Sequence, residues 1–397
     1  YDDIVHFFAP KKEHNGRALM RIAGFDDVYL DSQFPNGSEG TVYEYEVYRW
    51  ATTTVDRDPE SIKNAGSLSA PNGFVTIPFQ DLGDNKEDYR WHTLINNNRS
   101  RDDYEAIMAF FKVFGLPDEQ LEAAAPSRMD LDSVLRTLAL QSLVGPGDAA
   151  YTGSNEHNFR LYAEPNGLVH YMPWDWDSSF QRPTSAPLVG GGQLGRLARI
   201  PSHLRRYHGH LLDIVNRAFD EAYLERWTDH YGLLGKQSFS GRRSYLLSRA
   251  NFVRGALPNQ IPFEITTNDG ATLTSQSTAV ELTGKGWIDV VDIRLSESRV
   301  PLVVQWQDEE TWRLTVPLRA GENLLELTAT HHAGEPVGTD TITVVNESGE
   351  SAAAARNLVV SEIMYHPSDG GAEFIELLNT SDDLLDIGGV RFSQGIA

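Results

Sequence analysis

The chain has 397 residues, with 34 basic and 56 acidic side chains, and its formal net charge is −22. An acidic balance of this size excludes bulk binding of a nucleic-acid backbone, which requires a basic surface. The chain contains no cysteine, so disulfide scaffolds, iron–sulfur clusters and thiol nucleophiles are excluded as well. No apolar run approaches the roughly 18 residues of a membrane-spanning helix, and the length predicts two to four domains.

Residues 1–99 are polar and rich in turn-forming residues, and a helical block follows them. The first helix of this block is predicted to begin after Ser100, as the N-cap, and to end at Gly115. Its apolar positions follow the helical spacing i, i+3, i+4 and i+7: Tyr104, Ile107, Met108 and Phe111.

Two more helices are predicted farther along the chain. One begins after Asp130 and ends at Gly145, and because it is apolar almost all round we expect it to be buried. The other runs from about Ser202 to Phe219 with one apolar face. Between them, the glycine-rich stretch 190–195 lacks the ending of a phosphate-binding loop, so a flexible loop is predicted there.

The segment 145–180 holds the densest set of chemical groups. Asp148 follows the buried helix, and Asn158 leads into an apolar strand. After a tight Asn-Gly turn, the return strand leads to Asp175 and Asp177. A hairpin with polar residues at both ends brings Asp148, Asn158, Asp175 and Asp177 to one rim.

Carboxylate and amide oxygens are the ligands of hard cations such as Mg²⁺ or Mn²⁺. The same groups serve phosphoryl transfer, where one aspartate receives the hydroxyl proton and another holds the metal. A D-x-D sequence in a β loop is otherwise a solvated turn. Here the flanking Trp174 and Trp176 favour the metal site, because apolar surroundings make an unpartnered carboxylate costly.

Three segments in order, LALQSLVG, HNFRLY and PWDWD, lie between Met129 and Phe180 and closely resemble the spore coat protein H-like (CotH) kinase family. The resemblance implies an atypical protein-kinase fold over residues 1–255, with ATP and Mg²⁺ (or Mn²⁺) as cofactors. It assigns the catalytic role to Asp148. It assigns metal and cofactor binding to Asn158 and Asp175, with Asp177 beside them as a further metal ligand.

Two features depart from the usual kinase pattern. Asp148 and Asn158 are ten positions apart, whereas ordinary protein kinases keep this pair five apart; the CotH-like group tolerates the longer loop. No lysine can be assigned to the nucleotide phosphates, because Lys11 and Lys12 lie in a polar lead and Arg21 lies where a strand is expected. We therefore expect either that this part of an N-terminally incomplete kinase domain precedes Tyr1, or that the domain is a pseudokinase.

The acid that pairs with such a lysine is predicted at Glu44 or Glu46, although exposed strand glutamates are far commoner. Other candidate sites are weaker. The spacing of His203, His208 and His210 keeps them off one helix face, so packing or surface roles are predicted for them instead of zinc binding. A D-x-D sugar-nucleotide transferase is a third interpretation, disfavoured because no alternating βα series is present.

The pattern changes near Pro258 to a period of two, which predicts an all-β immunoglobulin-like sandwich over residues 256–346. A linker at 347–357 precedes a final segment, 358–397. Its sequences LVVSEIMYHP and AEFIELLNT resemble the start of a lamin-tail domain, here truncated.

These observations together predict a multidomain α+β protein, extracellular or on the cell surface. The predicted activity is transfer of the ATP γ-phosphoryl group to Ser or Thr of an extracellular or coat protein. The alternative is a non-catalytic pseudokinase that binds cell-wall polymer or a protein partner through its β domains. Neither a nucleic-acid partner nor a membrane span is expected.

Overall fold

The computed structural model describes residues 3–7, 11, 17–21, 24–45, 48–49, 74–75, 79–90, 93–152, 157–296, 298–349, 357–365, 373–382, 385, 387, 390 and 392. They form two compact units, Tyr1–Leu257 (unit 1) and Pro258–Ala397 (unit 2). Helices combine with mainly antiparallel sheets, so the molecule is a mixed α+β multidomain protein. Within these described ranges, no helix is both long and apolar enough to cross a membrane.

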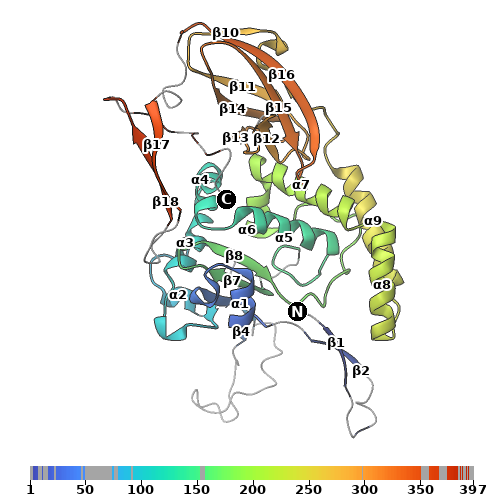
Figure 1. The fold of residues 1–397 in the computed structure, drawn as a ribbon. Helices are drawn as coiled ribbons and strands as arrows, with labels where there is room; N and C mark the ends of the chain where they lie inside the picture. The colour runs from blue at the N-terminus through green and yellow to red at the C-terminus, as the bar shows by residue number, and fades with distance from the viewer. Residues whose placement is uncertain are drawn as a thin grey trace. The chain divides into compact units, whose positions relative to one another are not determined.

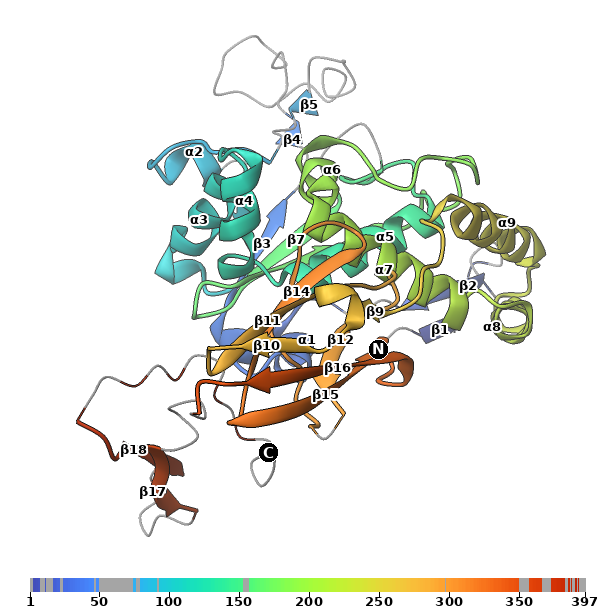
Figure 2. The ribbon, with the colours of Figure 1, turned by 90° about the horizontal axis from the view of Figure 1, so that it is seen from above.

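Unit 1 contains a four-stranded antiparallel sheet surrounded by helices (Figures 1 and 2). The sheet has the order β6 (Thr93–Ile95), β3 (Thr41–Tyr45), β7 (Phe159–Ala163) and β8 (Val169–Pro173). Two short pairs complete the strands, β1–β2 (Asp3–Phe7, Arg17–Arg21) and β4–β5 (Tyr48–Arg49, Phe74–Val75). The helices are α1 (Asp27–Gln33), α2 (Glu87–Arg90), α3 (Glu105–Val113), α4 (Asp118–Ala124), α5 (Leu131–Val144), α6 (Gly192–Arg199), α7 (Pro201–Arg217), α8 (Glu221–Gly235) and α9 (Ser240–Ala256).

The two faces of this sheet pack differently because successive side chains of a strand point to opposite sides. One face is buried against an aromatic cluster in which Phe159 stacks on Tyr45 at 4.6 Å and on Phe79 at 5.1 Å. The other face carries Val42 and Tyr162, which pack under α1. The sheet is therefore covered on both faces, and the β7–β8 hairpin lies at the centre of the unit.

Helix α5 has the predicted boundaries, since the Asp130 side chain accepts a hydrogen bond from the Ser133 amide and Gly145 ends the helix in the left-handed conformation. The predicted hairpin is also confirmed, with β7 and β8 paired antiparallel and Gly167 in its turn at φ +87°. Helix α7 begins one residue before the predicted start. These three elements are encoded by local signals, which explains why the sequence pattern identifies them.

Two sequence predictions in unit 1 are wrong. Ser100 does not cap α3: it lies in a short 3₁₀ turn, and a left-handed Asp102 separates that turn from the helix. Residues 190–195 are not a flexible loop, because α6 begins at Gly192. A side chain at Gly190 would collide with the backbone and ring of Tyr151, so tight packing accounts for this glycine.

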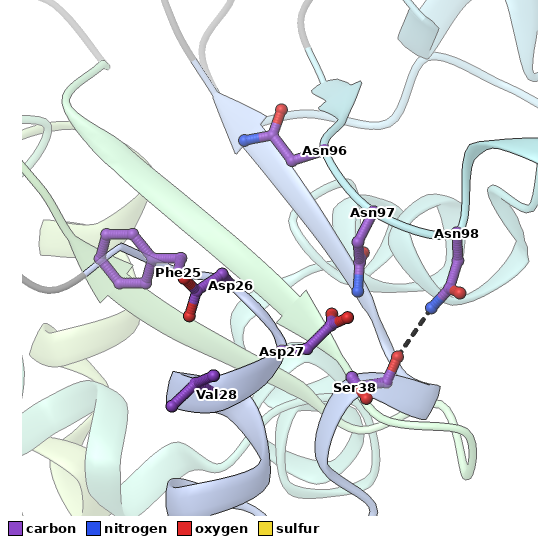
Figure 3. A pocket seen from close by; sticks show the side chains of 8 residues that line it. All are labelled: Phe25, Asp26, Asp27, Val28, Ser38, Asn96, Asn97 and Asn98. Atoms are coloured by element: carbon purple, nitrogen blue, oxygen red, sulfur yellow. Dashed lines mark hydrogen bonds between the residues drawn. The ribbon is translucent and has the colours of Figure 1, made fainter.

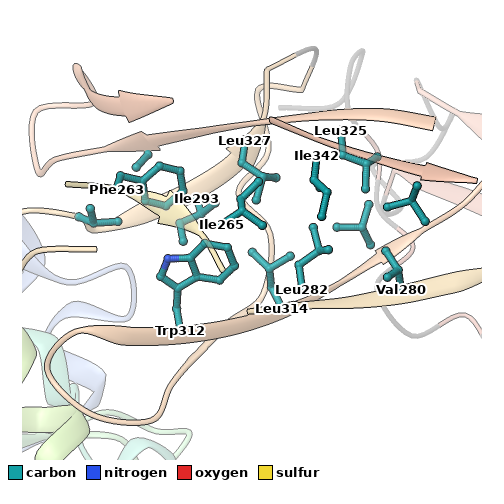
Figure 4. Packing of buried hydrophobic residues seen from close by; sticks show 14 of the residues in the cluster. Phe263, Ile265, Val280, Leu282, Ile293, Trp312, Leu314, Leu325, Leu327 and Ile342 are labelled. Carbon is teal, nitrogen blue, oxygen red and sulfur yellow. The ribbon is translucent and has the colours of Figure 1, made fainter. Parts of the chain in front are cut away.

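Unit 2 contains two four-stranded sheets that share one apolar core (Figure 4). Trp312, Leu314 and Val316 alternate inward along β14, as their period of two predicts, and meet Leu327 and Ile342 from the facing sheet. One sheet has the order β10 (Leu273–Ser275), β16 (Pro336–Asn346), β15 (Gly321–Thr330), β12 (Asp292–Leu295). The other has the order β13 (Val304–Trp306), β14 (Thr311–Pro317), β11 (Ala279–Lys285), β9 (Glu264–Ile265).

The last described element is an antiparallel hairpin of β17 (Leu358–Met364) and β18 (Phe374–Asn379). Several of its apolar side chains are exposed, among them Ile363 and Phe374. The predicted linker lies mostly outside the described residues.

Candidate active site

The position of Asp148 is set by the C-terminal end of helix α5. The helix ends at Gly145, and Pro146 then turns the chain away because it cannot supply the next helical N–H. The carbonyls left at this helix end are taken by the segment that follows β8: Phe180 N donates to Val144 O at 2.8 Å. The loop that carries Asp148 is thus tied to the loop that carries Asp175 and Asp177.

A closed ring of hydrogen bonds joins the predicted site residues. Asn158 Nδ2 donates to the Asp148 carbonyl at 2.8 Å, and the Trp174 amide donates to the Asn158 carbonyl at 2.8 Å. The ring closes through Ser178, whose Oγ accepts the Asp148 amide at 3.1 Å. Asp175 follows Trp174 directly, so its backbone adjoins this ring, and the common rim of the four side chains stays a prediction.

Three non-glycine residues in the described part of segment 145–180 have left-handed backbones: Asn158 at φ +62°, Asp175 at φ +52° and Phe180 at φ +68°. Asn and Asp tolerate this conformation better than other side-chain residues, and such positions gather at functional sites. Asn158 is buried, whereas the side chains of Asp148, Asp175 and Asp177 are exposed.

His157 is a member of the site that was not predicted from the sequence pattern. Its Nε2 lies 3.1 Å from Asp148 Oδ1, and its ring is buried while 58% of the Asp148 side chain is exposed. One carboxylate oxygen of Asp148 is therefore oriented by the buried imidazole, while the side chain as a whole stays exposed. Ser178 was also missed. Both residues could have been suspected from their place in the sequence, because each is next to a predicted site residue.

The donor set fits a hard cation. Asn158 uses its amide nitrogen for Asp148, and no described residue donates to its Oδ1. That oxygen and the exposed carboxylates of Asp175 and Asp177 are oxygen ligands of the type that Mg²⁺ and Mn²⁺ prefer. Among the described residues, however, no cluster of three His, Asp or Glu side chains is arranged to hold a metal, so a cation here depends on the amide and on substrate oxygens.

Strand β7 places a cation beside these groups. The Arg160 guanidinium lies over the ring of Trp174 at 4.6 Å and over the ring of Phe25 at 4.7 Å. Its Nη2 is 3.5 Å from Glu44 Oε1 on the neighbouring strand β3. Asn96 Nδ2 donates to the other oxygen of Glu44 at 3.0 Å. Glu44, one of the two acids predicted to pair with a cation, therefore pairs with an arginine.

A cavity of about 780 Å³ has residues in its wall that contact Arg160 and Glu44. Figure 3 shows the side chains that line it. Phe25 and Asn96, which contact Arg160 and Glu44, contribute to its wall. Asp26 and Asp27 add carboxylates, and Asn98 is fixed by donation to the Ser38 carbonyl at 2.8 Å. The cavity lies within the size range of small-molecule sites.

The remaining candidates lie elsewhere. Lys11 is exposed, and Lys12 and Glu46 lie outside the described residues, as does the side chain of Arg21. The predicted packing role of the three α7 histidines agrees with their burial, which leaves 3% of His203, 9% of His208 and 1% of His210 exposed.

No curated protein matches the chain in sequence. One solved structure that it resembles in part is an endo-beta-1,4-mannanase from Thermotoga petrophila, 13% identical, with a TM-score of 0.19. The match covers 28% of this chain and 25% of the mannanase chain. A likeness of that size carries no argument about the fold. Residues 25–244, more than half of the chain, match the family model described as CotH kinase protein, and the chain therefore belongs to the CotH kinase family.

Proposed function

We propose that unit 1 is a metal-dependent protein kinase that transfers the γ-phosphoryl group of ATP to a Ser or Thr hydroxyl of an extracellular or coat protein. The observation that carries this proposal is the hydrogen-bonded ring that joins Asp148, Asn158, Trp174 and Ser178. It fixes the backbone on either side of the residues that phosphoryl transfer requires. Membership of the CotH kinase family supports the same reaction.

Each residue of the site has a role in this proposal. Asp148 orients the acceptor hydroxyl and takes its proton, through the carboxylate oxygen that His157 leaves free. Asn158 Oδ1 and Asp175, with Asp177 beside them, hold Mg²⁺ or Mn²⁺. The metal supplies positive charge that neutralises the phosphate oxygens during transfer.

The proposal is tested by the thermal stability of the full chain with ATP and Mg²⁺. A ligand that binds only the folded state stabilises it by about 2.7 kcal/mol at a concentration 100 times its Kd. The wild type and the matched control Asp229→Ala, on the exposed face of α8, should be stabilised equally, and Asp175→Ala should not be. No shift in the wild type, or an equal shift in Asp175→Ala, would refute the metal–nucleotide site. Transfer of labelled phosphate to added protein then tests catalysis itself.

A pseudokinase is the second candidate, and a specific observation favours it. In the described part of the chain the site has no three-carboxylate cluster and no lysine beside it. In this case the domain serves as a surface module, and the β domains bind cell-wall polymer or a protein partner. Binding of ATP without any transfer of phosphate would select this candidate.

The same proposal includes the β domains. The strand order β9-β11-β14-β13 in one sheet matches the ABED order of constant-type immunoglobulin domains, and β12-β15-β16 in the other matches CFG. The second sheet has one strand more than that pattern, β10, which pairs parallel with β16. This order supports an immunoglobulin-type assignment for the sandwich. The β17–β18 hairpin supports the start of a lamin-tail domain only through its sequence. An extracellular or cell-surface location is proposed on these modules, and fractionation of the native host would test it.

A further inference from the structure

We propose that Arg160 binds the phosphate chain of the nucleotide, and so supplies the positive charge that kinases usually place on a lysine. The inference deepens the function proposed above and rests on it. It assigns a substrate-binding role to a position that lies between the recognisable residues of the HNFRLY segment.

The Arg160 guanidinium has hydrogen-bond donors that the described residues do not satisfy. Its Nε and Nη1 are buried, and within the described part of the chain neither has a hydrogen-bond partner. The Glu44 contact, at 3.5 Å, is too long to be a strong charge-assisted bond. Buried donors without acceptors are destabilising, and the oxygens of a phosphate group would satisfy two of them at once through the planar fork of an arginine.

The Arg160 side chain is firmly supported by aromatic rings. Phe25 and Trp174 contact each other edge to face at 5.8 Å, and both flank the guanidinium, at 4.7 and 4.6 Å. The Arg160 side chain is only 14% exposed. An arginine fixed in this way loses little further freedom when it binds an anion. A cation held in place before the ligand arrives is typical of a binding site and not of a solvated surface.

Arg160 is close in the chain to two proposed metal ligands. It follows Asn158 by two positions, and the Trp174 ring that its guanidinium contacts belongs to the residue directly before Asp175. The cavity of Figure 3 is lined by Phe25 and contains the carboxylates of Asp26 and Asp27. Because these carboxylates disfavour a bare anion, we expect binding of the phosphate chain to require Mg²⁺.

Isothermal titration of the full chain with ATP and Mg²⁺ tests the inference, with Arg160→Met and Arg160→Lys compared with the wild type. The exposed Arg206 on α7, changed to Met, is the matched control. We expect Arg160→Met to raise the Kd for ATP about tenfold or more, because charge-assisted hydrogen bonds are lost. The Kd for ATP of Arg160→Lys should lie between those of the wild type and Arg160→Met. The Kd of Arg206→Met should equal that of the wild type. Circular dichroism and melting temperature confirm that each variant is folded, and Arg160→Lys keeps the test valid if the methionine variant unfolds.

Competition between ATP and inorganic tripolyphosphate, both with Mg²⁺, tests whether Arg160 contacts the phosphate chain or the nucleoside. We expect its inhibition constant to rise with Arg160→Met in step with the Kd for ATP. A tripolyphosphate constant that stays unchanged while ATP binding weakens would assign Arg160 to the nucleoside and overturn the inference. An ATP Kd within twofold of wild type in both variants would overturn it while leaving the kinase proposal intact. Binding that depends on Arg160 without transfer of phosphate would uphold the inference and overturn catalysis, and a wild type that binds no ATP would overturn both.

Discussion

Replacing the buried Arg249 tests how the candidate site is anchored. This residue of α9 is 1% exposed, and its guanidinium donates to four backbone carbonyls and one hydroxyl. Nε donates to Ser142 O at 3.2 Å, and Nη1 donates to Thr184 O at 3.0 Å and to Ala186 O at 2.5 Å. The carbonyl of Ser142 has no helical partner because the residue four positions later is Pro146. Arg249 therefore completes the end of α5 from a distant helix.

The expected loss of stability follows from these contacts. Arg249→Met keeps much of the volume but removes the donors to three carbonyls that have no other donor among the described residues. A buried acceptor left without a partner costs about 1–3 kcal/mol. Part of this is returned because the charge of the arginine no longer has to be buried. We expect the free energy of unfolding to fall by about 3–5 kcal/mol.

Urea denaturation of the full chain, followed by tryptophan fluorescence and circular dichroism, measures this loss in the transition of unit 1. Arg206→Met is the control, because Arg206 lies on α7 of the same unit and its side chain is exposed; its change should stay below about 1 kcal/mol. Arg249→Lys should recover only part of the loss, since an ammonium cannot reproduce the planar fork. A loss for Arg249→Met no greater than that for Arg206→Met would show that the carbonyls do not depend on the Arg249 guanidinium.

Three further changes have definite expected results. Ser178→Ala removes the acceptor of the Asp148 amide, so stability should fall by about 1 kcal/mol and that amide should exchange its hydrogen faster. Burial lowers the pKa of His203 below its ordinary value of 6.5, so the unfolded state binds the proton more strongly. The stability that depends on this group is therefore present above pH 6.5 and lost as the pH falls through the lower pKa of the folded state, and the melting temperature should drop between about pH 7 and pH 5. Gly284→Ala places a methyl group against the Trp312 ring and should destabilise the sandwich by about 1–3 kcal/mol, measured by urea denaturation.

Matched variants separate these effects from general damage. Ser179→Ala should leave exchange at the Asp148 amide unchanged, because the Ser179 hydroxyl donates only to the Trp176 carbonyl. If His203→Gln melts with the same pH profile as the wild type, the histidine assignment is wrong. Gly255→Ala, at an open position inside α9, should stabilise by about 0.5–1 kcal/mol. Equal effects of the two glycine substitutions would contradict the packing argument.

The sequence predicts those parts of the site that short-range signals encode. Helix α5 was predicted because a capping Asp130 and a terminating Gly145 bracket an apolar run, and the β7–β8 hairpin was predicted from its Asn-Gly turn. Helix α6 was missed because glycines at its start suggested a loop, whereas tight packing against Tyr151 requires one of them. A local pattern cannot distinguish a glycine that is needed for space from one that confers flexibility.

The contacts that complete the site could not be predicted, because they join positions far apart in the chain. The Arg160–Glu44 pair depends on β3 lying beside β7, which the sequence does not state. The role of the Ser178 hydroxyl appears only once the loop of Asp148 is folded against it, because the two residues are 30 positions apart. The metal ligands themselves remain a prediction, supported by the donor set.

The proline that ends α5 has a consequence for how the protein is made. Because Pro146 has no N–H, the Ser142 carbonyl takes its hydrogen bond from Arg249, which is synthesised 107 residues after Ser142. A nascent chain that has left the ribosome as far as α7 contains Asp148, Asn158 and Asp175, yet its helix end is still without its last donor. Long-range contacts of this kind form late. All proposed active-site residues are therefore synthesised well before the contact that anchors them can form. A chain that ends before α9 should retain every one of these residues without holding them in place.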